Sequence, residues 1–169
     1  MAVGKVVGLE REPRERVCGA IIKDNAILMV HHQHGPHDYW TLPGGAIETG
    51  ESPEEAVERE VQEETSLRAK VSCFLFESEF HTKVAHTIEK CYLLEVTGDQ
   101  EPERGHDPEL RAEQQVIKGV AWFPIDEVRD DIQVSKVIDA LKRLSEGRRP
   151  ASHSWVQSAP HNKSLEPTH

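Results

Sequence analysis

A break in regular structure, followed at once by a strongly signalled helix, constrains this fold more than any other feature of the sequence. Pro43-Gly44-Gly45 interrupts regular structure, because proline lacks a backbone N–H and glycine allows conformations that other residues resist. Ser52 is a favoured N-cap, Pro53 suits the first helical position, and Glu55 completes a capping box. We therefore expect a loop that leads into a helix running to about Thr65.

The expected helix is densely acidic. Eight glutamates and one basic residue, Arg59, lie between positions 48 and 64. Glu60 and Glu64 are one turn apart and Glu63 lies beside them, so three carboxylates share a face and repel by a few tenths of a kcal/mol per pair. One alternative is that a glutamate-rich helix merely presents a solvated or metal-buffering face, with no substrate. The clustering indicates a bound cation, and ligands that are all oxygen favour magnesium or manganese.

The remaining pattern is that of a mixed α/β domain. Strands are expected at residues 16–23 and 26–30, joined by a tight turn at Asp24-Asn25, and further extended segments at 39–42, 69–80, 86–96 and 120–123. A polar loop is expected at 31–38 and a longer one at 98–115. A short helix should begin at Pro124 and run through Val128. An amphipathic helix should span Val134 to Leu144, with Gly147 as its stop.

Length and charge limit the classes of protein. A chain of 169 residues is the size of one domain, and its net charge of -10 argues against general nucleic-acid binding. Three cysteines favour reduced thiols over a disulfide framework. With no signal peptide and no membrane-length apolar run, we expect a soluble, cytoplasmic protein that does not bind membranes. Residues 1–13 are expected to form a poorly defined leader, 14–147 the domain, and 148–169 a polar, disordered tail.

The acidic helix and its lead-in resemble the Nudix hydrolase family. Gly45, five residues, Glu51, seven residues, then Arg59-Glu60-Val61-x-Glu63-Glu64 reproduces the Nudix box, with Leu67 at its last apolar position. Ser66 replaces the final glycine of the box. Because that position often needs a positive φ, serine should cost about 1 kcal/mol there without removing a ligand.

The resemblance implies a fold, a reaction and roles for particular residues. The fold would be the Nudix α/β/α sandwich, a mixed, curved β-sheet between helices. Glu60, Glu63 and Glu64 would be the catalytic residues and would bind Mg²⁺ or Mn²⁺ with the backbone of Gly45. Glu51 and Arg59 would form a structural ion pair that orients these ligands.

The expected reaction is hydrolysis of a phosphoanhydride bond in a nucleoside diphosphate linked to another moiety, releasing a nucleoside monophosphate. ADP-ribose-like compounds, nucleotide sugars, (d)NTPs and dinucleoside polyphosphates all remain open as the small-molecule substrate, and a homodimer is compatible with the resemblance. The alternative is a non-catalytic Nudix-fold module that senses a nucleotide. Such modules typically lose box glutamates, whereas this chain keeps Glu51, Glu60, Glu63 and Glu64.

Other residues are weaker candidates for contacts with the substrate. Tyr39 and Trp40 could stack on a base, and His81 stands at a strand end. Glu113 or Glu109 could supply a carboxylate from outside the box, with a solvated acidic loop as the alternative. The histidines before the box could contact phosphate, bind zinc or have no role; they are His31, His32, His34 and His37.

Overall fold

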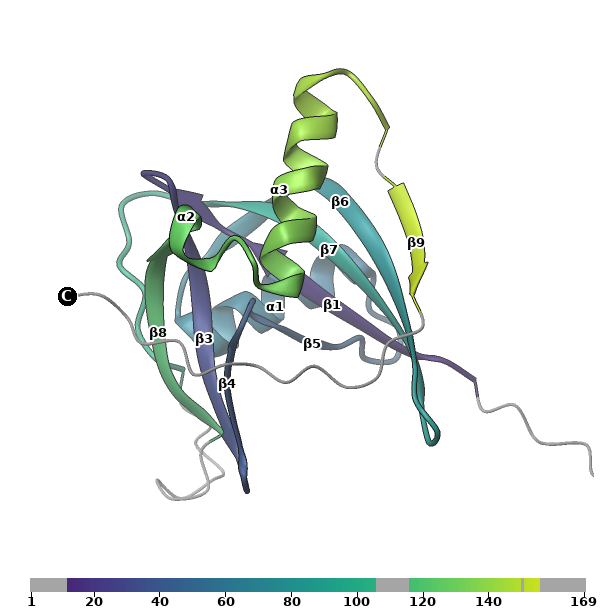
Figure 1. Cartoon of the computed structure of the whole chain (residues 1–169). Helices are drawn as coiled ribbons and strands as arrows, with labels where there is room; N and C mark the ends of the chain where they lie inside the picture. The colour runs from purple at the N-terminus through teal and green to yellow at the C-terminus, as the bar shows by residue number, and fades with distance from the viewer. Residues whose placement is uncertain (1–11, 106–115, 150, 156–169) are drawn as a thin grey trace, which may run out of the picture.

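The computed structural model describes residues 12–105 and 116–149 and the backbone of residues 151–155. Within these residues the chain forms two sheets and three helices, which confirms the expected α/β architecture (Figure 1). The strands of the first sheet are β1 (Arg14–Ala20), β5 (Gly44–Ala46), β6 (Ala69–His81), β7 (His86–Val96) and β9 (Ala151–Trp155). Those of the second are β2 (Ile22–Lys23), β3 (Ala26–His34), β4 (His37–Thr41) and β8 (Ile117–Pro124).

The first sheet is mixed and carries the acidic helix. Its strand order is β5-β1-β7-β6-β9, with β1 parallel to β7 and antiparallel to β5. The helix α1 (Pro53–Thr65) packs on one face of this sheet, and α3 (Ile132–Ser145) covers the other (Figure 1). Strand β8 belongs to the second sheet through its pairing with β3, and the short α2 (Ile125–Val128) follows β8 in the chain. The acidic helix is thus held against β1 and β5, the strand that contains Gly44 and Gly45.

Alternating side chains of β1 pack into two hydrophobic cores on opposite faces of the sheet. Val17 packs with Val57 and Val61 on the α1 side, and all three are fully buried. Cys18, the next residue, joins the α3 side with Phe123. Because successive side chains of a strand point to opposite faces, one strand fixes both helices relative to the same backbone.

The ends of α1 agree with the sequence signals. The Ser52 side chain accepts a hydrogen bond from the Glu55 N–H, and the Glu55 carboxylate accepts one from the Ser52 N–H. At the other end, Ser66 adopts the left-handed conformation, with φ 61°. Asp24 and Asn25 also have positive φ values, of 50° and 59°, as a tight hairpin turn requires. These local predictions are confirmed.

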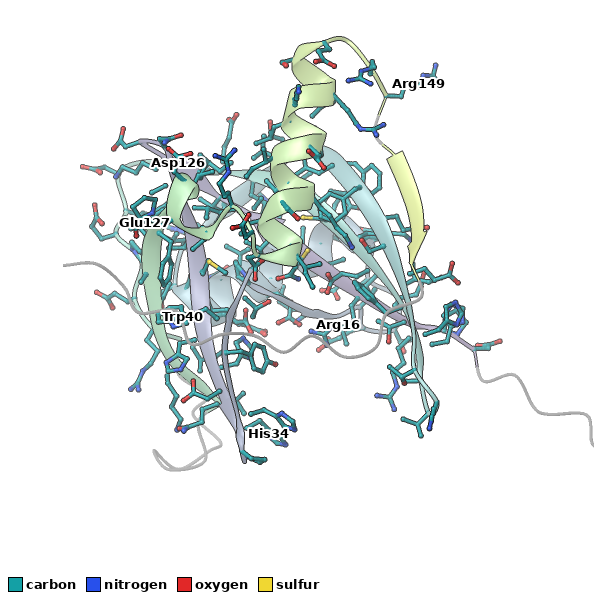
Figure 2. All side chains as sticks on the ribbon, in the orientation of Figure 1. Arg16, His34, Trp40, Asp126, Glu127 and Arg149 are labelled. Atoms are coloured by element: carbon teal, nitrogen blue, oxygen red, sulfur yellow. The ribbon has the colours of Figure 1, made fainter. Side chains whose placement is uncertain are left out.

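The expected polar loop at residues 31–38 is wrong. These residues belong to the hairpin of β3 and β4, in which His31 lies opposite Trp40 and His34 opposite His37. Figure 2 shows His34 at the far end of this hairpin. Strong polarity hid the strands, because both faces of the hairpin are partly open to solvent near its tip and apolar alternation is lost there.

The C-terminal segment also differs from the expectation. Residues 151–155 form β9, which pairs in parallel with β6 from Phe76 to Phe80, so this part of the expected disordered tail is a strand. Residues 1–11 and 156–169 lie outside the described residues. Within the described part of the chain, no helix is long and apolar enough to cross a membrane.

Candidate active site

The glycines of β5 and the glutamates of α1 are in direct contact. The Gly44 N–H donates a hydrogen bond of 2.9 Å to Glu64 Oε2. A Cβ placed on Gly45 would lie 2.2 Å from Glu60 Oε1, so the Glu60 carboxylate lies against the bare backbone of that residue. Only glycine at position 45 leaves room for this carboxylate in its observed position.

Arg59 joins the box glutamates to one another. Its Nε and Nη2 donate to the two carboxylate oxygens of Glu51, at 2.8 and 3.0 Å, in a bidentate pair. Its Nη1 donates to Glu60 Oε1 at 2.9 Å and to Glu63 Oε2 at 3.2 Å. Its Nη2 also donates to the Ala46 carbonyl oxygen. One guanidinium therefore holds three carboxylates and the end of β5 in a fixed arrangement.

The electrostatics differ between Glu51 and Glu60, two of the three carboxylates that Arg59 contacts. Hydrogen bonding from Arg59, and then from the Glu48 N–H, lowers the pKa of Glu51. Burial raises the pKa of Glu60, and the charges of Glu64 and Glu63 add to this effect, while Arg59 opposes it. A half-buried carboxylate surrounded by like charges is the environment in which a cation gains most.

His32 supplies an observation that tests whether a cation fits. Its Nε2 lies 3.3 Å from Glu64 Oε1 but is not aligned for a hydrogen bond, and it is the one buried side-chain polar atom in the described part of the chain with no hydrogen-bond partner. A buried polar atom without a partner is costly unless something else satisfies it. Glu60, Glu63 and Glu64, together with the Gly45 backbone, fit a hard divalent cation, because every donor among them is oxygen.

A groove runs beside the C-terminal half of α1. The segment after β7 closes one side of it: the Glu103 N–H donates to the Thr65 carbonyl oxygen and the Gly105 N–H to that of Glu64, both at 2.9 Å. A Cβ on Gly105 would lie 1.8 Å from the Glu63 carbonyl oxygen. The groove is polar, and its lining residues are Arg59, Gln62, Glu63, Ser66, Glu103, Arg104 and Gly105.

A buried polar network on the α3 side was not predicted from the sequence. Gln133 Oε1 accepts hydrogen bonds from the Thr41 hydroxyl at 2.7 Å and from the Leu42 N–H at 3.1 Å. Gln133 Nε2 donates to Glu89 Oε1 at 3.1 Å, and Arg16 lies 3.9 Å from the other Glu89 oxygen. This network fixes the chain directly ahead of Pro43-Gly44-Gly45. The cue for it is Glu89, a charged residue that alternates with the apolar Cys91 and Leu93 of the α3-side core.

The weaker candidates lie in different places. Tyr39 is exposed and stacks on His32, with ring centroids 5.6 Å apart, so it lies near Glu64. Trp40, which is labelled in Figure 2, lies on β4 and is half-buried; it stacks on His31 and packs edge-on against Phe123. His81 lies at the end of β6 and contacts Glu79 instead of the box. Glu109 and Glu113 are outside the described residues.

The four histidines before the box lie in different places and have different partners. His31 pairs with Asp38 and His32 lies beside Glu64, while His34 and His37 face each other nearer the hairpin tip. Among the described residues, the ligand atoms of three His, Cys, Asp or Glu side chains lie within 4.8 Å of one another only at Glu79, His81 and His86, so the box carboxylates would have to close around an ion. The structure therefore does not gather the histidines before the box into a zinc site.

Comparison with known proteins assigns the family. The NUDIX domain model matches residues 13–143, which is most of the chain, and this protein belongs to that family. Solved structures agree on the fold: a NUDIX hydrolase from Nitrosomonas europaea has a TM-score of 0.63 at 24% identity, covering 82% of this chain and 93% of that one. A UDP-X diphosphatase has a TM-score of 0.61 at 26% identity, covering 86% of this chain and 67% of its own.

The names of similar proteins refer to different substrates. An ADP-ribose pyrophosphatase from Methanocaldococcus jannaschii is 40% identical over 91 residues, 52% of this chain and 54% of that protein. The human diphosphoinositol polyphosphate phosphohydrolase 2 is 28% identical over 152 residues, 88% of this chain and 79% of that protein. The match thus spans only about half of the archaeal relative, and the names of the relatives differ in substrate.

Proposed function

We propose that this protein is a divalent-metal-dependent pyrophosphohydrolase that cleaves a phosphoanhydride bond in a nucleoside diphosphate linked to another moiety. The observation that carries the proposal is the contact of the Glu60 and Glu64 carboxylates with Gly45 and Gly44. Carboxylates placed against bare backbone, and oriented by Arg59, form a site for a cation and a polyphosphate together.

Each residue has a distinct part in this proposal. Glu60, Glu63 and Glu64 hold the cation; Arg59, itself paired with Glu51, donates hydrogen bonds to the first two and so fixes their positions. A bound Mg²⁺ or Mn²⁺ supplies charge neutralisation at the pyrophosphate and makes water more acidic. Glu63 is the most exposed of the three, with 59% of its side chain accessible, and it lines the groove in which the substrate would lie.

The choice of a nucleotide over a more highly charged substrate follows from charge. The chain carries a net charge of -10, and the groove contains Glu63 and Glu103 beside Arg59 and Arg104. A substrate with many phosphates would need a strongly basic surface. A diphosphate with one linked moiety matches the balanced charge of this groove better, which supports a substrate of the kind named for the ADP-ribose pyrophosphatase among the relatives. The free thiols Cys18, Cys73 and Cys91 support a reducing, cytoplasmic setting.

A substrate panel tests the proposal. The full chain is incubated with ADP-ribose, a UDP-sugar, a dNTP, a dinucleoside polyphosphate or a diphosphoinositol polyphosphate, with Mg²⁺ or Mn²⁺. Nucleoside monophosphate and phosphate are then measured separately. We expect release of a nucleoside monophosphate from one of the nucleotide substrates. Release of phosphate from the diphosphoinositol compound alone would overturn the proposed substrate class.

Variants connect the activity to the site. Glu63→Gln and Glu64→Gln should abolish turnover while the protein stays folded. Glu58→Gln is the matched control, because Glu58 lies on the same helix but pairs with Lys70 and the Val71 N–H instead. Full activity in both site variants would refute the mechanism. Nucleotide binding with no turnover of any substrate would favour the sensor instead.

A further inference from the structure

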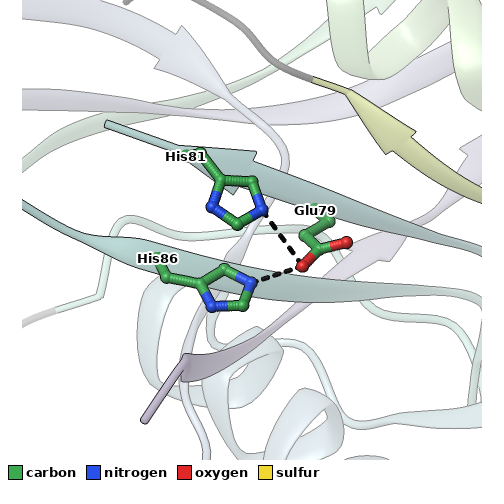
Figure 3. A group of neighbouring side chains, drawn as sticks. All are labelled: Glu79, His81 and His86. Atoms are coloured by element: carbon green, nitrogen blue, oxygen red, sulfur yellow. Dashed lines mark hydrogen bonds and ion pairs between the residues drawn. The ribbon is translucent and has the colours of Figure 1, made fainter. Parts of the chain in front are cut away.

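Three potential metal ligands meet at the end of the β6–β7 hairpin, away from the Nudix box. His81 of β6 lies directly opposite His86 of β7 in the antiparallel register. Glu79 precedes His81 by two residues, so its side chain is on the same face of the hairpin. Figure 3 shows both imidazole rings turned toward the Glu79 carboxylate.

The ligand atoms of this cluster already converge. Nε2 of His81 lies 3.1 Å from Glu79 Oε1, and Nε2 of His86 lies 2.5 Å from the same oxygen. The two rings are stacked, with centroids 4.1 Å apart and planes 18° apart. One donor atom from each residue falls within 4.8 Å of the other two. Their side chains are between 26% and 47% exposed, so an ion can reach them from solvent.

The spacing is close to that of a tetrahedral metal site. Ligands about 2.0–2.1 Å from a zinc ion stand roughly 3.3 Å from one another. The two nitrogen–oxygen distances of 3.1 and 2.5 Å therefore need to open by less than about 1 Å to admit the ion. Hairpin side chains at this exposure can make such an adjustment by small rotations.

The chemistry of the ligands sets the class of ion. Imidazole nitrogens suit zinc, copper, nickel and cobalt, whereas magnesium prefers oxygen ligands and retains water. We propose that Glu79, His81 and His86 bind one zinc-class divalent ion, with water in the remaining coordination position. Two histidines and one carboxylate leave that position open, as in zinc sites that exchange a ligand.

This site is separate from the carboxylates of α1. Glu60 and Glu64 contact β5, while the cluster is formed by β6 and β7, and the strand order β5-β1-β7-β6 sets β5 three places from β6. At about 4.8 Å per strand, β5 and β6 are roughly 14 Å apart across the sheet. The proposed ion would thus tie β6 to β7 and need not take part in the hydrolysis.

Calorimetric titration of the full chain with zinc chloride tests the proposal, with millimolar Mg²⁺ present to compete for the oxygen ligands of α1. We expect one high-affinity zinc ion per chain. His81→Gln, His86→Gln and Glu79→Gln should each weaken this binding at least about tenfold, since even residues that only orient a ligand contribute that much. Cobalt substituted for zinc should give the visible absorption of a four-coordinate site, and the variants should lose it.

A second histidine pair provides the control. His34 and His37 also face each other across a hairpin, that of β3 and β4. The double variant His34→Gln/His37→Gln should bind zinc as the unmodified chain does. Equal melting temperatures of all variants in EDTA would show that they are folded. Unchanged zinc affinity in His81→Gln/His86→Gln would overturn the proposal, and so would loss of the ion in the control variant.

Discussion

The carboxylate of Glu60 occupies the space that a side chain on Gly45 would need. A Cβ at position 45 would lie 2.2 Å from Oε1 and 2.6 Å from Oε2 of Glu60. Strand β5 and helix α1 therefore fit together at this position because residue 45 has no side chain and leaves room for the Glu60 carboxylate.

Gly45→Ala should remove activity with little loss of fold. The new methyl group meets only the end of a flexible side chain, which can turn away, so the Glu60 carboxylate moves and the ligand set is lost. We expect kcat/KM to fall at least about 100-fold, since an error of about 1 Å in position costs that much. Gly119→Ala is the control, because its Cβ would meet Trp40 and His31 at ordinary distances, 3.5 and 3.7 Å. Equal activity of both variants would contradict the role of Gly45.

Arg59→Lys should lower activity although it keeps the charge. Lysine cannot reproduce the bidentate bonds to Glu51 while also reaching Glu60 and Glu63. We expect kcat/KM to fall about 10- to 100-fold, the usual effect of losing a residue that orients metal ligands. The Mg²⁺ concentration needed for half-maximal activity should rise in parallel. Lys70→Gln, which breaks only the exposed pair with Glu58, should leave both quantities unchanged.

Ser66→Gly should stabilise the protein. Ser66 has φ 61° and ψ 5°, a conformation that glycine adopts without the steric cost that serine bears. We expect the free energy of unfolding in urea to rise by up to about 1 kcal/mol. Ser66→Ala keeps a Cβ and should give no such gain. A gain in the alanine variant as large as that in the glycine variant would show that the left-handed backbone is not the cause.

Asp131→Asn should change how stability depends on pH. Asp131 caps α3 by accepting the N–H groups of Gln133 and Val134, and burial raises its pKa in spite of these bonds. A raised pKa means that the folded state binds the proton more tightly than the unfolded state. This carboxyl therefore adds stability as the pH falls through its folded pKa toward the ordinary value.

Comparing the unmodified protein with the Asp131→Asn variant isolates the contribution of the Asp131 carboxyl to the pH dependence of stability. Asparagine keeps an acceptor for the cap but does not titrate. The unfolding free energy of the unmodified protein, minus that of Asp131→Asn, should therefore increase from neutral to acidic pH. Urea unfolding at a series of pH values measures the difference. A difference that stays constant, or that shrinks toward acidic pH, would contradict the raised pKa.

The parts of the fold that could be predicted depend on short-range signals. The ends of α1 follow from Ser52, Glu55 and Ser66, each acting within one turn of the chain. Val57 and Val61 are on the buried face because their spacing matches the helix period. The bidentate contact of Arg59 with Glu51 spans eight residues, and the family pattern was needed to anticipate it.

The parts that could not be predicted depend on contacts between distant residues. The hydrogen bond from the Thr41 hydroxyl to Gln133 Oε1 joins positions 92 residues apart, and no local pattern marks either one. Apart from Gly35-Pro36, residues 31–37 are polar, so apolar alternation does not mark the hairpin, whose strand β3 pairs with β8 as far as His32. His81 was recognised only as a strand-end residue, because its proximity to His86 depends on the register of β6 and β7.

The hydrogen bond from Gly105 to the Glu64 carbonyl oxygen has a consequence for how such a protein can diversify. With the companion bond from the Glu103 N–H, it holds residues 103–105 against the last turn of α1, where they form one wall of the groove. Substitutions of Glu103 or Arg104 would therefore alter which molecules the groove admits, while the carboxylates of the helix stay as they are. Selectivity can then be exchanged among descendants through two wall residues, with the hydrolytic apparatus inherited intact.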